Sequence, residues 1–100
     1  MVNLVRTVAL LDKPGEGFAL AVEITKYLRE FEEVADAQLV TNINGPQNQL
    51  HFVVSFDSLA EEEKFARRAY EDQRYMELMK RSTGKLSWPT DNLSRTIALD

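Results

Sequence analysis

Few residues of this chain could do chemistry, and two of them lie within predicted strands. His51 is the only histidine among the 100 residues, and a neutral imidazole can take a proton from a quinol or an enol near neutral pH. Arg6 interrupts a run of apolar residues, and its guanidinium can hold a carboxylate or an enolate oxygen. We therefore treat His51 and Arg6 as candidate catalytic residues. The alternative for His51 is a hydrogen-bonded histidine without chemistry. The alternatives for Arg6 are an interface ion pair and a polar edge residue.

Four further residues are candidates for binding a substrate. Alternation along the strands places Asn42 and Ser55 on the same face as His51, where both can orient a ligand oxygen. Trp88 precedes the last strand and can close a cavity or wall an aromatic ligand. Arg95 lies on the last strand, where a dimer contact is its alternative role. The simpler interpretation of Asn42 and Ser55 is ordinary polarity near a hairpin. For Trp88 the alternatives are a cover over one end of the fold and a part of the dimer contact.

Several other kinds of site are excluded by residue types and motifs. The chain has no cysteine, which rules out disulfides, thiolate metal sites and cysteine nucleophiles. A single histidine without further ligands does not make a metal site. Gly15-Glu16-Gly17 lacks the third glycine and the context of a dinucleotide-binding loop, and no nucleophile-elbow motif is present. We expect no cofactor and no metal.

Charge and hydropathy limit the partners. Lys and Arg number 12 against 16 Asp and Glu, a net charge of −4, which disfavours binding to a phosphate backbone. No apolar run approaches the roughly 20 residues that span a bilayer, and residues 1–6 lack the features of a signal peptide. We expect a cytoplasmic protein with no nucleic-acid or membrane partner.

Residues 1–100 form one predicted domain, without repeats or linkers. Period-two alternation of apolar residues predicts strands, and helical spacing predicts helices. The capping box Ser58-Leu59-Ala60-Glu61 marks the start of the second helix. The predicted strands cover residues 2–11, 36–43, 49–57 and 92–99, and the predicted helices cover 16–32 and 58–82.

The element order βαββαβ predicts an α+β, ferredoxin-like fold. Right-handed crossovers place both helices on one face of a four-stranded antiparallel sheet with strand order 4-1-3-2. The strands carry apolar residues on both faces, and a bare apolar face needs a cover. A homodimer with two-fold symmetry, paired through this sheet face, supplies that cover. We place Arg6 on the face away from the helices, together with Leu4, Val8, Leu10, Val40 and Val53.

The stretch Asn42-Ile43-Asn44-Gly45-Pro46, followed by His51-Phe52-Val53 and Phe56-Asp57-Ser58-Leu59-Ala60, resembles the dimeric α/β-barrel superfamily. Its NIPSNAP-like and antibiotic-biosynthesis-monooxygenase-like domains are the nearest in pattern. The resemblance implies a dimer whose sheets enclose a barrel, often with a cavity for a hydrophobic molecule. Some members are cofactor-free oxygenases of polyketide quinols, and some degrade haem. The haem-degrading members rely on a helix-borne histidine, which the second helix here lacks, so that activity is not carried over.

Two hypotheses follow for the function. The first is a small cofactor-independent, monooxygenase-like enzyme acting on an aromatic or enolic substrate. His51 would take a proton, Arg6 would stabilise the oxyanion, and Asn42 and Trp88 would position the substrate. The second is a non-catalytic ligand-binding or dimerisation module, in which the same residues serve polar satisfaction and the interface. A deep pocket on which His51 and Arg6 converge would favour the first hypothesis.

Overall fold

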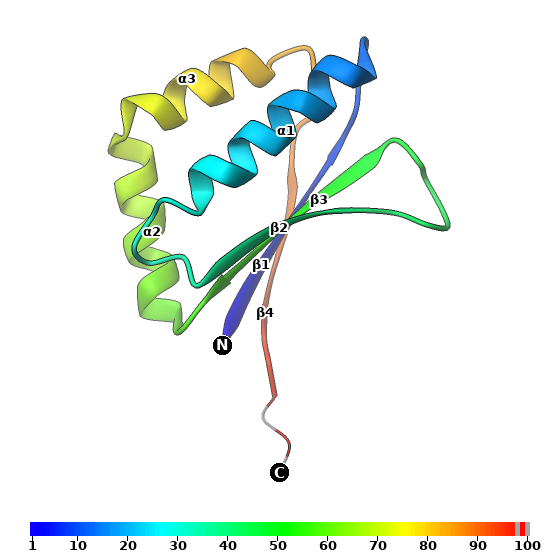
Figure 1. Ribbon diagram of the computed structural model, residues 1–100. Helices are drawn as coiled ribbons and strands as arrows, with labels where there is room; N and C mark the ends of the chain where they lie inside the picture. Colours follow the sequence, from blue (N-terminus) through cyan, green and yellow to red (C-terminus); the bar gives the residue numbers. More distant parts are fainter. Residues whose placement is uncertain (98, 100) are drawn as a thin grey trace.

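The computed structural model describes residues 1–97 and 99. Ala98, within the last predicted strand, and Asp100, at the end of the predicted domain, lie outside the described residues. The elements follow the predicted order, with the second helix divided in two (Figure 1). In chain order they are β1 (Val2–Ala9), α1 (Pro14–Leu28), β2 (Asp36–Thr41), β3 (Gln49–Phe56), α2 (Leu59–Glu71), α3 (Gln73–Ser82) and β4 (Thr90–Arg95).

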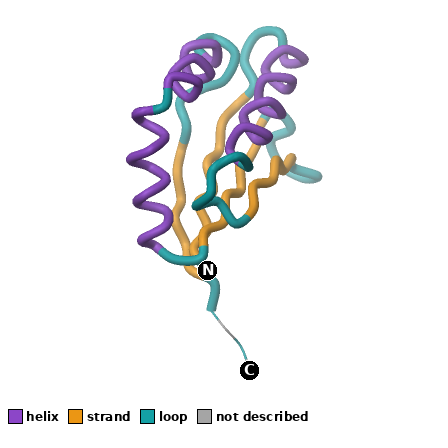
Figure 2. The backbone as a smooth tube through the Cα atoms, turned by 60° about the vertical axis from the view of Figure 1, so that its left-hand side comes forward, coloured by secondary structure: helices purple, strands orange, loops and turns teal. Residues whose placement is uncertain are grey.

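The four strands form one antiparallel sheet in the order β2-β3-β1-β4. This is the predicted order 4-1-3-2 counted from the other edge, so the ferredoxin-like α+β fold is confirmed. The helices lie together on one side of the sheet, and the other side has no covering element in the described chain (Figures 1 and 2). No helix of the described residues is long and apolar enough to cross a membrane.

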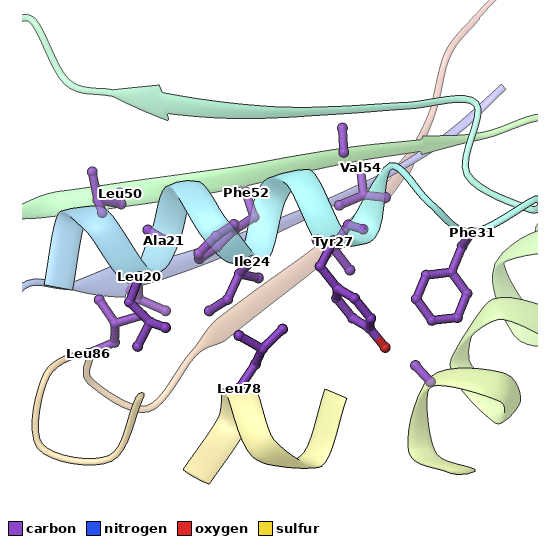
Figure 3. Close-up of a cluster of buried hydrophobic side chains, with 14 of the residues drawn as sticks. Leu20, Ala21, Ile24, Tyr27, Phe31, Leu50, Phe52, Val54, Leu78 and Leu86 are labelled. Atoms are coloured by element: carbon purple, nitrogen blue, oxygen red, sulfur yellow. The ribbon is translucent and has the colours of Figure 1, made fainter. Parts of the chain in front are cut away.

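The hydrophobic core lies between the sheet and α1. Along β3 every second side chain is buried, which matches the predicted alternation of Leu50, Phe52, Val54 and Phe56. The apolar stripe of α1 packs on these residues (Figure 3). At one end of the core an aromatic cluster forms, in which the rings of Phe31 and Phe65 meet edge to face at 4.9 Å.

The prediction of a single helix over 58–82 is wrong, because the helix is interrupted at Asp72, between α2 and α3. The capping prediction at its start is confirmed, since the Ser58 hydroxyl accepts a hydrogen bond from the Glu61 amide at 3.3 Å. Asp72 has an extended backbone, and its carboxylate accepts from the amide of Arg74 at 2.8 Å. An aspartate that satisfies the first free amides starts a new helix. Gly84 adopts a left-handed conformation beyond α3, with φ of 81°.

The prediction that Leu4, Arg6 and Val8 of β1 lie on the sheet face away from the helices is also wrong. Leu4, Arg6 and Val8 point toward the helices, where they line a cavity with residues of α1 and α2. Alternation separates the two faces of a strand but does not say which face the helices cover, and both faces of β1 carry valines. The opposite face of β1 holds the alternating residues Asn3, Val5, Thr7 and Ala9.

The uncovered face is therefore mostly polar. Thr7 lies opposite His51, and Asn3 lies opposite Ser55 in the pairing of β1 with β3. Val53 lies on this face as predicted, where it pairs with Val5 near the centre. Val40, paired with His51, also lies on the predicted face. An antiparallel sheet tolerates water on one polar face. The argument for a dimer from a bare apolar face therefore fails, while the dimer itself stays a prediction.

Candidate functional site

A cavity of about 240 Å³ lies between the sheet and the helices. Its walls are largely apolar and come from every layer: Leu4 of β1, Phe52 of β3, Ile24 of α1 and Phe65 of α2 are among them. Such a mostly apolar hollow with a few converging polar groups is typical of small-molecule sites.

A hydrogen-bonded polar cluster of the cavity comes from two neighbouring strands and from α3. Arg6 and Asp91 lie directly opposite each other in the pairing of β1 with β4. The Arg6 Nε donates to Asp91 Oδ1 at 2.8 Å, and its Nη2 donates to Oδ2 at 2.9 Å. The Arg6 Nη1 approaches the Tyr75 hydroxyl at 3.5 Å. Three side chains from three elements thus form one polar cluster.

This ion pair shifts the pKa values of both its members. The hydrogen bonds from Arg6 hold the pKa of Asp91 below its usual value, although partial burial acts in the opposite direction. The hydrogen bond to Asp91 raises the pKa of Arg6 above its usual value. Each group is therefore stabilised in its charged form by the other.

The break between α2 and α3 positions the aromatic side chains of the cavity. Tyr75 lies in the first turn of α3, where its amide also donates to the Asp72 carboxylate at 3.4 Å. The ring of Tyr70, near the end of α2, lies 6.0 Å from that of Tyr75 in an edge-to-face arrangement. Both tyrosines line the cavity, together with Met79.

A second hollow of about 490 Å³ adjoins the first, and Arg6, Tyr70 and Tyr75 line both. Trp88 lines only this outer hollow and is 94% exposed. The predicted cavity-closing residue therefore lies at the rim and leaves the hollow open.

His51 lies on the other face of the sheet, within a hydrogen-bonded row. Its Nε2 is 2.8 Å from Asn42 Oδ1, and its Nδ1 is 2.8 Å from Thr7 Oγ1. The Asn42 amide nitrogen donates to the Pro46 carbonyl at 2.6 Å, so its oxygen is the acceptor. This assigns the proton of a neutral His51 to Nε2, and the Thr7 hydroxyl then donates to Nδ1.

His51 and Arg6 do not converge on one point, although the mechanism of the first hypothesis requires it. Arg6 pairs with Phe52 across the two central strands, and His51 is the residue before Phe52. Successive side chains of a strand point to opposite faces. Arg6 is accommodated on the helix-covered face because Asp91 neutralises it there, a partner that strand alternation does not reveal.

The remaining predicted residues divide between the two faces. Asn42 and Ser55 share the uncovered face with His51, as predicted, and the Ser55 hydroxyl donates to Asn3 Oδ1 at 2.9 Å. Arg95 is exposed on β4, opposite Val2, and so on the same face as Asp91. Neither cavity described here includes Asn42, Ser55 or Arg95 in its lining.

Sequence reasoning did not identify Asp91, Tyr70, Tyr75 or Met79 as residues of the cavity. Tyr75 and Met79 also pack against the hydrophobic core. The available signal was an arginine within a strand, which requires an acidic partner when it is partly buried. Which of the 16 acidic residues supplies it depends on the strand register. The described residues contain no group of three or more histidine or acidic side chains that could hold a metal ion.

The fold and the cavity define a small ferredoxin-like α+β protein with a ligand-sized hollow between sheet and helices. No family model matches the chain, and no curated protein matches it. Solved structures do match over nearly the whole chain.

One is an uncharacterised NIPSNAP-domain protein from Burkholderia xenovorans, with a TM-score of 0.82, 16% identity and coverage of 100% of this chain and 98% of that one. A second is SnoaB, a cofactor-independent oxygenase from Streptomyces nogalater, with a TM-score of 0.78, 10% identity and coverage of 98% and 94%. A third is a NIPSNAP-family protein of unknown function from Agrobacterium tumefaciens, with a TM-score of 0.76, 16% identity and coverage of 100% and 91%. The structural neighbours are thus NIPSNAP and antibiotic-biosynthesis-monooxygenase proteins, as the resemblance predicted. At these identities the likeness shows the fold alone.

Proposed function

We propose that the protein binds a small hydrophobic molecule in the cavity between its sheet and its helices. The observation that carries the proposal is the meeting of a mostly apolar wall with a polar cluster formed by Arg6, Asp91 and Tyr75. The wall favours transfer of an apolar ligand out of water. The cluster supplies donors that can fix the position of a ligand oxygen.

Binding can be tested with 1-naphthol, a neutral two-ring probe, by titration calorimetry. Ala66 of α2 lines the cavity, whereas Ala60 of the same helix is exposed. We expect Ala66→Phe to fill the cavity and weaken binding about tenfold or more. Ala60→Phe makes the same chemical change outside the cavity and should bind like the unaltered protein. Equal binding by both variants would contradict the proposal, provided that both keep the native thermal midpoint.

A finer proposal is that the bound molecule is an aromatic or enolic substrate of a cofactor-independent, monooxygenase-like reaction. The likeness to SnoaB supports it, together with a cavity whose polar end holds a guanidinium and a phenol. Tyr75 would donate its hydroxyl hydrogen to a substrate oxygen, and Arg6, which contacts the Tyr75 oxygen, would hold that phenol in place. Oxygen uptake with aromatic quinols tests this activity, with Arg6→Met as the comparison. Absence of uptake by a protein that binds 1-naphthol would favour the alternative, a non-catalytic ligand-binding module.

We also propose that the protein forms a homodimer through the uncovered sheet face. The polar groups of this face bond to one another, as the contacts of His51 with Thr7 and Asn42 show. Polar groups that already have partners lose less on leaving water. Val5 and Val53 supply an apolar centre.

Light scattering after size exclusion tests the dimer. We expect twice the chain mass for the unaltered protein and the mass of one chain for Val53→Glu. The control is Ile43→Glu in the loop before β3, where the side chain is 91% exposed. A monomeric unaltered protein would overturn the dimer and leave the cavity proposal intact.

A further inference from the structure

We propose that Asp91 makes the cavity selective for uncharged ligands, so that it takes neutral hydroxylated aromatic molecules and rejects the matching carboxylates. This inference rests on the proposed function, since it concerns the ligand of the same cavity. It reverses the role expected of Arg6 from the sequence, which was to hold a carboxylate or an enolate oxygen.

The donors of Arg6 are committed to Asp91. Nε and Nη2 form the two-point bond with the Asp91 carboxylate, at 2.8 and 2.9 Å. This is the geometry with which a guanidinium binds any carboxylate, a ligand's included. An acidic ligand would therefore have to displace Asp91 from Arg6 or accept from Nη1 alone.

The charge around the cavity disfavours an anion as well. Among the described residues that line it, Arg6 is positive while Asp91 and Glu62 are negative. Asp91 already neutralises Arg6. A ligand carboxylate that moves from water to a position beside this pair would therefore meet no free positive charge, and it would lie close to the negative Asp91. Such an uncompensated charge is costly to bury.

A neutral hydroxyl fits the same cluster. In the contact between Arg6 Nη1 and Tyr75 the guanidinium is the donor and the phenol oxygen is the acceptor. The hydroxyl hydrogen of Tyr75 is not used in that contact and can donate to a ligand oxygen. The Asp91 carboxylate can accept a hydrogen bond from a ligand hydroxyl. A phenol can do both, whereas a carboxylate can only accept.

The test compares 1-naphthol with 1-naphthoate, two probes of the same ring system that are neutral and anionic at pH 7. For the unaltered protein we expect calorimetric titration to show naphthol bound about tenfold more tightly than naphthoate or better. Asp91→Asn keeps the side-chain shape but removes the negative charge that neutralises Arg6. We expect it to raise the affinity for naphthoate about tenfold and to leave that for naphthol within about threefold.

Two further variants serve as controls for the effect of Asp91→Asn. Asp36→Asn makes the same chemical change on β2, on the uncovered face, and should leave the preference for naphthol unchanged. The double variant Arg6→Met with Asp91→Leu has neither charge, so it should bind naphthol and still reject naphthoate. If Asp91→Asn failed to fold, this variant would still test the charge argument, because naphthoate bound as tightly as naphthol would overturn the inference.

The outcomes separate the two proposals. Naphthoate bound as tightly as naphthol by the unaltered protein, or an unchanged preference in Asp91→Asn, would overturn the inference and leave the cavity as a binding site. Binding of neither probe by the unaltered protein or by Asp91→Asn would overturn the proposed function and the inference with it.

Discussion

Arg6 and Asp91 face each other across the paired strands β1 and β4 and join through two parallel hydrogen bonds. The pair links the edge strand to the centre of the sheet at the polar end of the cavity. Its two side chains keep 28% and 43% of their surface exposed. It is therefore a partly screened pair, whose effect on stability should be modest.

A double-mutant cycle measures that effect. We expect Arg6→Met, Asp91→Leu and the double variant to give a coupling free energy of about 0.5–1 kcal/mol in urea unfolding. Because the pair is partly exposed, the coupling should shrink in 1 M salt, where the Debye length is about 3 Å. A coupling near zero at low salt would show that the pair only orients the two side chains.

Low pH should lower the stability of the folded protein, because it protonates carboxylates that form ion pairs in the folded state. The pKa of Asp91 lies below 3.8, its usual value, chiefly because Arg6 donates to it. Burial has the largest single effect on Glu33 and would raise its pKa. The hydrogen bond and the charge of Arg68, with a backbone hydrogen bond and the charge of Lys64, together outweigh burial, so the pKa lies below its usual value. A lowered folded pKa means that the unfolded chain binds more protons, so stability is full above the usual values and is lost as pH falls through the folded ones.

The midpoint of urea unfolding, measured between pH 7 and pH 3, checks this expectation. We expect a nearly constant midpoint down to about pH 5 and a steep decline below it. Glu33→Gln removes one of the carboxylates, so its midpoint should fall less steeply with acid, whatever its value at pH 7. An identical slope in the variant would contradict the assigned direction for Glu33.

The core should be most sensitive at the end of β3. Phe56 is fully buried, with its ring 5.3 Å from that of Phe65. Phe56→Ala should lower the free energy of unfolding by about 3–5 kcal/mol, because a cavity replaces the ring. Ile43→Ala removes apolar atoms from a side chain that is 91% exposed and should change it by less than about 0.5 kcal/mol. Similar losses in both would mean that Phe56 is not part of a tightly packed core.

His51 should not affect the cavity. Because it lies on the uncovered face, His51→Ala should leave the affinity for 1-naphthol within about twofold of the unaltered value. Tyr75→Phe, which removes a hydroxyl from the cavity, should weaken the same binding. If His51→Ala weakened binding as much as Tyr75→Phe, the two faces of the sheet would be coupled in a way that the geometry does not explain.

We expect the loss of the Asp72 side chain to lower both the stability of the protein and its affinity for 1-naphthol. Asp72→Ala removes the cap of α3 and should lower the free energy of unfolding by about 1 kcal/mol. Because the cap also holds the Tyr75 amide, we expect weaker binding of 1-naphthol as well. Asp72→Asn keeps the capping oxygen and should restore both properties. Restoration of stability without binding would place the effect on the ligand elsewhere.

The sequence by itself determined the element order, the sheet order and most of the core. Apolar periodicity is a local property, and the alternation from Leu50 to Phe56 needs no partner to be recognised. The capping box at Ser58 is equally local, because donor and acceptor are three residues apart. Even the grouping of His51 with Asn42 and Ser55 followed from alternation and the hairpin.

Only the tertiary structure decided which face of β1 the helices cover and which acid meets Arg6. Asp91 is 85 residues from Arg6 along the chain, and the register of an edge strand brings them together. The valines on both faces of β1 leave the choice of face to packing against α1 and α2. The separation of His51 from Arg6, and the cavity that holds only one of them, follow from that choice.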